Sequence, residues 1–142
     1  MFLSRNCIKT NEKYVDGVYN ITIEDETRGI TVTYTDKGDI CIINNGIEHN
    51  INFNDLKDIA IAQEKICIMR EHLLLICDFD GAVKRTIHAP PNYTFNKFIK
   101  IGDSLEVSCT VTEVNTDKHD RTEWNFKYNK QLGYWEHIGL SD

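Results

Sequence analysis

The chain lacks the features that several common protein classes require. It has only two prolines and eight glycines in 142 residues, which argues against disorder. Its longest apolar runs, such as Leu73–Cys77, have the length of a strand, and none approaches the roughly 20 apolar residues of a membrane helix. No segment repeats its apolar residues with a helical period. These absences predict a helix-poor single domain spanning residues 1–142.

Positive charge and paired cysteines are also scarce. The formal net charge is −6, and a nucleic-acid partner would need clustered Lys and Arg, so we expect none. The five cysteines form an odd set without a C-x-x-C pair, and four of them sit in apolar segments, which suits a reducing compartment. The first residues lack the apolar core and cleavage site of a signal peptide. We therefore expect a cytoplasmic protein with no membrane contact.

Three stretches repeat one hairpin pattern, in which an apolar strand, a polar turn and a returning strand follow one another. They are Ile30–Asn45, Leu73–Ala89 and Trp124–Leu140. From Asp36 to Asp80 is 44 residues, and from Asp80 to Asn129 is 49. A period of roughly 40–50 residues with several strands in each unit is typical of propeller blades. The pattern predicts an all-β fold of antiparallel four-stranded meanders repeated about three times, which is an incomplete (half) β-propeller.

Alternating apolar residues place most strands individually. The expected strands are Val18–Glu24, Ile30–Tyr34, Ile40–Ile43, a short edge strand within Ile47–Asn54, Ile59–Ala62, Ile66–Arg70, Leu73–Phe79, Val83–His88, Phe98–Ile101, Leu105–Thr112, Trp124–Tyr128 and Gly133–Ile138. The longest connection, Glu113–Glu123, is expected to be a loop, and loops of that length are often functional.

The Leu73–Ala89 segment, with its Asp-Phe-Asp-Gly turn between two strands, resembles the outer hairpin of a propeller blade. A small, acidic, truncated propeller is also similar to immunity proteins of bacterial toxin systems, including contact-dependent growth inhibition. The resemblance covers most of the chain as a pattern, although neither the Trp-Asp dipeptide nor the Kelch diglycine is present. It implies a protein without an enzymatic site whose partner is a cognate toxin domain, often a basic nuclease.

The motif Asp78–Gly81 (DFDG) allows two interpretations. A D-x-D pair after an apolar strand resembles the nucleophile strand of haloacid-dehalogenase-type phosphotransferases, where the carboxylates attack phosphorus, transfer protons and hold magnesium. That chemistry needs a parallel α/β sheet, which this chain does not predict. The other interpretation is a hairpin turn in which Asp80 and Gly81 supply positive φ.

Other chemistry-bearing residues give weaker signals. His119 lies beside Asp117 and Asp120, so this loop is a candidate for a metal or an acid–base pair, or for a solvated loop. The serines lack the glycine-flanked elbow of hydrolases, and the cysteines lie in apolar strands. The glycines are isolated at turns and form no phosphate-binding loop, so we expect no cofactor.

Carboxylates concentrate in the connections, and aromatic residues surround the last turn. Propeller turns gather on two rims, where such charges would attract a basic partner. The expected partner-binding residues are Asp78, Asp80, Asp117, Asp120, Glu123, Tyr134 and Trp135. These residues favour a non-enzymatic protein that neutralises a basic toxin domain by direct binding. Two alternatives stay open: a metal-dependent phosphohydrolase using Asp78 and Asp80 or His119, and a β module that self-associates through open sheet edges.

Overall fold

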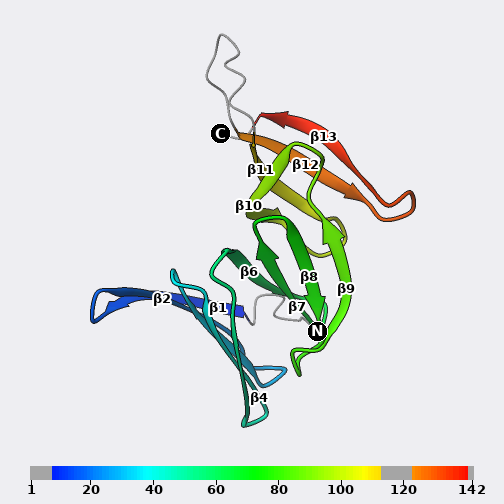
Figure 1. The fold of residues 1–142 in the computed structure, drawn as a ribbon. Coiled ribbons are helices and arrows are strands. Elements are labelled where there is room, and N and C mark those ends of the chain that lie inside the picture. The colour runs from blue at the N-terminus through cyan, green and yellow to red at the C-terminus, as the bar shows by residue number, and fades with distance from the viewer. Residues whose placement is uncertain (1–7, 113–122, 141–142) are drawn as a thin grey trace.

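The computed structural model describes residues 8–112 and 123–140, and it is built from strands (Figure 1). Strands account for 70% of the described residues, which contain no helix and therefore none that could span a membrane. Three separate antiparallel sheets follow one another along the chain, and each is a meander of neighbouring strands. The expected all-β class with about three repeated meanders is confirmed.

Sheet A is formed by the N-terminal third of the chain. It consists of β1 (Ile8–Val15), β2 (Val18–Asp25), β3 (Ile30–Thr35), β4 (Asp39–Asn44) and β5 (Ile47–Asn52). The sequence predicts four strands beginning at Val18, and the structure adds β1 as a fifth strand at the edge. Asp16 and Gly17, with φ of 52° and 78°, form the two-residue turn that joins β1 to β2. Positive φ at both positions is what a tight hairpin of this twist requires.

Sheets B and C each have the four strands that the sequence predicts. Sheet B consists of β6 (Leu56–Ala62), β7 (Lys65–Arg70), β8 (Leu73–Cys77) and β9 (Val83–His88). Sheet C consists of β10 (Tyr93–Lys100), β11 (Glu106–Val111), β12 (Glu123–Asn129) and β13 (Tyr134–Leu140). The strand β10 starts five residues before its expected position at Phe98, and two register shifts interrupt its pairing with β11.

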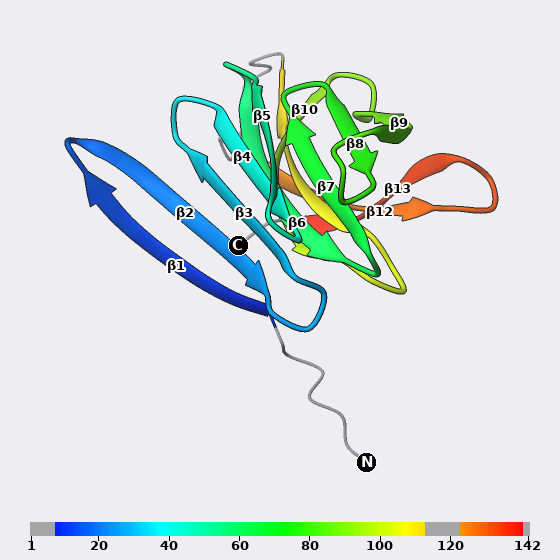
Figure 2. The same cartoon turned by 90° about the horizontal axis from the view of Figure 1, so that it is seen from below.

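The repeat is most regular at the first strand of each four-stranded unit. From Val18 in β2 to Leu56 in β6 is 38 residues, and from Leu56 to Tyr93 in β10 is 37. These three strands also approach one another, because β6 contacts both β2 and β10. Figure 2 shows the sheets side by side, with sheet B between sheets A and C. This arrangement is compatible with part of a propeller.

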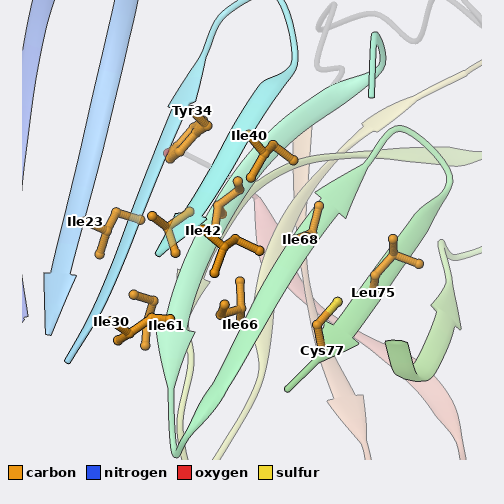
Figure 3. Packing of buried hydrophobic residues seen from close by; sticks show 12 residues of the cluster. Ile23, Ile30, Tyr34, Ile40, Ile42, Ile61, Ile66, Ile68, Leu75 and Cys77 are labelled. Carbon is orange, nitrogen blue, oxygen red and sulfur yellow. The ribbon is translucent and has the colours of Figure 1, made fainter. Parts of the chain in front are cut away.

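Two apolar cores hold the sheets together, one on each face of sheet B. In the first, the isoleucines of sheet A, among them Ile30 and Ile42, pack against Ile61 and Ile66 of sheet B (Figure 3). The second core lies between sheets B and C and is built around Phe95. Because both faces of sheet B are covered, four consecutive residues of β7 are buried instead of every second one.

The outer faces of the stack are polar. One row across the outer face of sheet A contains Asn11, Thr22, Thr33, Cys41 and Asn50. The outer face of sheet C carries Lys97, Glu106 and Lys127. Stacking a further sheet on either face would bury these polar groups, which costs free energy unless each finds a hydrogen-bond partner.

Candidate functional site

Asp78 lies at the start of the turn between β8 and β9 and holds that turn together. Its Oδ1 atom accepts hydrogen bonds from the backbone N–H of Asp80 at 3.0 Å and of Ala82 at 3.1 Å. Lys84 Nζ lies 3.6 Å from the other carboxylate oxygen. Partial burial opposes ionisation of Asp78, but the bonds from Ala82 and Asp80 and the charge of Lys84 lower its pKa below the usual value.

The same turn contains Asp80 and Gly81, and it links two sheets. Asp80 Oδ1 accepts a hydrogen bond of 3.1 Å from Asn44 Nδ2, at the end of β4 in sheet A. The motif forms a hairpin turn between the antiparallel strands β8 and β9, as expected, and Gly81 has a φ of 85°. The expectation of a positive φ at Asp80 is wrong, because only Gly81 of this pair has one. The phosphotransferase interpretation requires a strand in a parallel α/β sheet, whereas β8 pairs in antiparallel fashion on both sides. The described residues contain no group of three His, Cys, Asp or Glu side chains placed to hold a metal.

Tyr134 and Trp135 lie at the start of β13, beside a groove between sheets B and C. The Trp135 indole Nε1 donates a hydrogen bond of 2.8 Å to the carbonyl of His88, at the end of β9. Its ring contacts Tyr128 and Phe95, with centroids 5.0 and 5.7 Å apart. Tyr134 is 50% exposed. Trp135 is therefore a structural link between two sheets, and Tyr134 is the more accessible of the two aromatic side chains.

The groove has a volume of about 480 Å³ and an aromatic and proline lining. Its lining includes Pro90, Pro91, Tyr93, Phe126 and Tyr128. Sequence reasoning did not assign these residues to a site. Their only signal was the Pro-Pro pair, which we interpreted as the end of a unit.

A cation stands beside this groove. Arg85 Nη2 donates a hydrogen bond of 3.0 Å to the Tyr128 hydroxyl, and its guanidinium carbon lies 5.4 Å from the ring centroid. Arg85 is exposed and lies on β9, as does Lys84. Arg85 therefore places one positive charge beside the predicted aromatic anchors, whereas Lys84 lies on the other face of β9 and pairs with Asp78.

The remaining predicted carboxylates lie elsewhere. Glu123 begins β12, where its Oε1 accepts a hydrogen bond of 2.7 Å from Asn96 Nδ2. Asp117, Asp120 and the alternative candidate His119 lie outside the described residues.

The structure does not bring the predicted set together. Strand β9 has six residues and separates the Asp78–Asp80 turn from the Trp135 contact, a span of about 17 Å at a normal strand rise. Tyr134 pairs with Asn129, the last residue of β12, whereas Glu123 is the first residue of that strand. These two ends of β12 are about 20 Å apart. The described residues of the predicted partner-binding set therefore lie in three separate places and do not form one compact interface.

Negative charge is concentrated in sheet A. Residues 8–53 carry eight acidic and four basic side chains, whereas the other described residues carry ten acidic and nine basic ones. The acids are Glu12, Asp16, Glu24, Asp25, Glu26, Asp36, Asp39 and Glu48. Two thirds of the formal charge of −6 therefore belongs to this one sheet. The sequence indicates that carboxylates concentrate in the connections, and the strand pairing shows that residues 8–52 form one sheet.

Asp25 differs from the other acids of this sheet because it is 1% exposed. Arg28 Nη1 donates to its Oδ2 atom at 2.9 Å, and the Arg28 backbone N–H donates to Oδ1. Burial disfavours the charged form, but the bonds from Arg28 outweigh it and lower the pKa of Asp25. This pair is neutral as a unit, so the surplus charge of sheet A comes from its other carboxylates.

Asp58 stands where the three sheets meet. It belongs to β6, and its Oδ1 atom accepts hydrogen bonds from the backbone of Ile59 at 2.9 Å and from the Tyr34 hydroxyl of sheet A at 3.4 Å. Its Oδ2 atom accepts from the backbone N–H of Phe98 in sheet C at 2.9 Å. Burial raises the pKa of Asp58 in spite of these bonds and of the nearby Lys97.

The chain matches no protein-family model and no curated protein. Its possible function therefore has to be inferred from the geometry of its own surfaces. Two surfaces are distinctive: the acidic sheet A, and the aromatic groove beside Arg85, between β9 and β13.

Proposed function

We propose that the protein is a non-enzymatic binding protein that neutralises a basic protein domain by covering it. The observation that carries this proposal is the charge distribution along the chain, because residues 8–53, which form sheet A, hold a net charge of −4. In biological terms the proposal is an immunity protein of a bacterial toxin system such as contact-dependent growth inhibition. Its partner is a toxin domain, most simply a nuclease, whose substrate-binding surface is basic.

The physical drive is charge complementarity. A field of one sign attracts a partner of the opposite sign, raises the association rate and disfavours partners of the wrong charge. A nuclease surface carries Lys and Arg because it must bind phosphates. An acidic sheet that occupies this surface excludes the nucleic acid without any chemical step.

The phosphohydrolase alternative loses support from the geometry of the β8–β9 turn. Both backbone bonds of the Asp78 Oδ1 atom serve the turn, and Asp80 bonds to Asn44. The self-association alternative loses support from the polar outer faces of sheets A and C. Its remaining route is edge pairing, and the outermost strand of sheet A carries Lys9, Glu12 and Lys13, charges of the kind that discourage such pairing.

The test is the kinetics of binding to the protein encoded immediately upstream. Asp36 and Glu48 are exposed on sheet A, so both are changed to Lys. We expect the association rate at low salt to fall about tenfold, and the difference from the wild-type protein to shrink in high salt. The control reverses Asp103 and Glu136, two exposed acids of sheet C and its neighbourhood, and should change the rate much less.

Inhibition is measured in parallel, with the upstream protein digesting nucleic acid in the presence of increasing amounts of this chain. We expect activity to disappear at a fixed stoichiometry. Association that depends neither on salt nor on the charge of sheet A contradicts electrostatic capture. A complete lack of binding contradicts the proposed function itself.

A further inference from the structure

The β1–β2 hairpin projects from the edge of sheet A. In Figures 1 and 2 it forms the outer edge of the molecule, on the side away from sheets B and C. All eight residues of β1 are exposed, and Tyr14 is 72% exposed. The two-residue turn at Asp16 and Gly17 holds the strands in full register from Val15–Val18 to Ile8–Asp25. The two strands of the hairpin are thus fully paired, although no residue of β1 is buried.

Strand alternation divides the side chains of the hairpin between two faces. Glu12 pairs with Ile21, and Tyr14 pairs with Tyr19, so these residues share the face on which Ile23 packs against sheet B. We call the group Glu12, Tyr14, Tyr19 and Ile21 the hairpin inner face. The lysines of β1, Lys9 and Lys13, alternate with these residues and lie on the opposite face. The hairpin inner face therefore carries a carboxylate and two aromatic rings but no basic side chain.

Glu12 and the two tyrosines form one contact group. The rings of Tyr14 and Tyr19 are tilted by 48°, with centroids 4.9 Å apart. The nearby Glu12 carboxylate is the main reason why the pKa of Tyr19 rises to about 12. Tyr34, deeper in sheet A, has its pKa raised chiefly by burial, but also by Asp58 and Glu12. Both Tyr19 and Tyr34 therefore lie close enough to Glu12 to be affected by its charge.

This combination fits a particular kind of ligand group. A Lys or Arg cation is attracted to the face of a tyrosine ring and, more strongly, to a carboxylate at the same place. Neither Lys9 nor Lys13 can supply this cation from its own face, and Lys9 Nζ already pairs with Glu26 at 2.9 Å. The hairpin itself therefore supplies no cation to this face.

We propose that the hairpin inner face is a docking site for a Lys or Arg side chain of a protein partner. The cation lies against the Glu12 carboxylate and over the ring of Tyr14, and the aliphatic stem of the basic side chain covers exposed ring surface. The inference rests on the proposed function, because the basic partner is the same one. It adds the place where that partner is held most tightly, which the charge distribution of sheet A alone does not specify.

The experiment measures equilibrium and dissociation kinetics with the upstream-encoded protein at one salt concentration. The variants are Glu12→Gln and Tyr14→Leu, which change the site without touching a buried residue. We expect each to weaken binding about tenfold, mainly through faster dissociation, as for a desolvated anchor at the centre of an interface. The double variant should lose less than the product of the two single effects, because both residues hold one cation.

The matched control is Asp36→Asn, which removes one negative charge from sheet A at the β3–β4 turn. It should change the dissociation constant less than threefold, since a rim charge contributes mainly to the association rate. Circular dichroism and the unfolding midpoint confirm that all variants fold alike.

The outcomes separate the two proposals. If wild type binds and both hairpin variants bind like Asp36→Asn, the docking site is wrong while the proposed function stands. If only Tyr14→Leu weakens binding, the contact is apolar and the cation assignment is wrong. If wild type does not bind, the proposed function is wrong and the docking site is wrong with it.

Discussion

Asp58 shows how one side chain can join three sheets. Its two oxygens accept from Ile59 in its own strand, from Tyr34 in sheet A and from Phe98 in sheet C. A carboxylate suits this place because it offers only acceptors, and all three neighbours are donors. Burial raises the pKa of Asp58, so the protonated form is favoured in the folded chain relative to the unfolded chain.

The change Asp58→Asn tests this role. An asparagine amide offers one acceptor oxygen and one NH₂ donor, so at least one of the three donors that bond to Asp58 loses its acceptor. We expect this loss to lower the free energy of unfolding by about 1–3 kcal/mol. Because the folded pKa is raised, the stability due to Asp58 is fully present below the unfolded value of 3.8 and falls as pH rises through the folded pKa. Urea unfolding should therefore show the largest wild-type advantage at acid pH.

The pKa values of Asp25 and Asp55 are shifted in the direction opposite to that of Asp58, which has to be taken into account in this measurement. Arg28 and Arg70 outweigh the effect of burial and lower the pKa of their carboxylates, so the stability they provide is lost as pH falls through the lowered values. The comparison of Asp58→Asn with wild type removes this common background. A wild-type advantage that grows toward neutral pH contradicts the raised pKa.

At the scale of elements, burial decides which strands the sequence reveals. Strands β7 and β8 contribute residues to both cores, so their sequences are apolar runs and they are predicted close to their observed bounds. Strand β1 was not predicted because none of its residues is buried and its sequence lacks alternating hydrophobicity. The signal that marks it is the Asp16-Gly17 pair, a strong hairpin signal that the hydrophobic pattern did not support.

The turn between β3 and β4 is a second place where one element depends on another. Gly38 has a φ of 89°, its N–H donates to Thr35 at 3.0 Å, and its carbonyl accepts from the Phe53 N–H at 2.9 Å. A Cβ atom at this position would overlap the Phe53 carbonyl. The β3–β4 turn is therefore packed against the segment that leaves β5.

Gly38→Ala and Gly46→Ala form a matched pair. Both glycines have positive φ, but a Cβ atom at Gly46 meets nothing within 4 Å. We expect Gly46→Ala to cost about 1–2 kcal/mol, from backbone conformation alone. Gly38→Ala should lower the free energy of unfolding at least twice as much, because the backbone must also move away from Phe53. Equal urea midpoints for the two variants would show that the segment after β5, which contains Phe53, does not constrain the β3–β4 turn.

At the scale of the whole molecule, the repeat was predictable and the surfaces were not. The spacing of matched hairpins predicted three antiparallel units, since each unit must bury its apolar faces against a neighbour. The sequence does not show that Trp135 reaches the carbonyl of His88, or that Asp80 bonds to Asn44, because both contacts depend on how the sheets stack. For this reason, the residues that the sequence predicts to form one interface lie apart in the folded structure.

Charge illustrates the same limit. Counting along the sequence places −4 of the formal charge of −6 in residues 8–53, but only the strand pairing shows that these residues form one sheet. The contact of Arg85 with Tyr128, beside the Trp135 groove, was equally hidden. A basic partner should bind sheet A, because the surplus of acidic side chains lies there.

Hydrogen–deuterium exchange of the chain, alone and with the upstream-encoded protein, tests this choice most directly. If a basic partner docks on sheet A, the amides of β1 and β2 should exchange more slowly in the complex, since the exposed edge of the hairpin becomes covered. Strands β9 and β13 should be unchanged. Protection confined to β9 and β13, with β1 exchanging as in the free chain, would contradict the account.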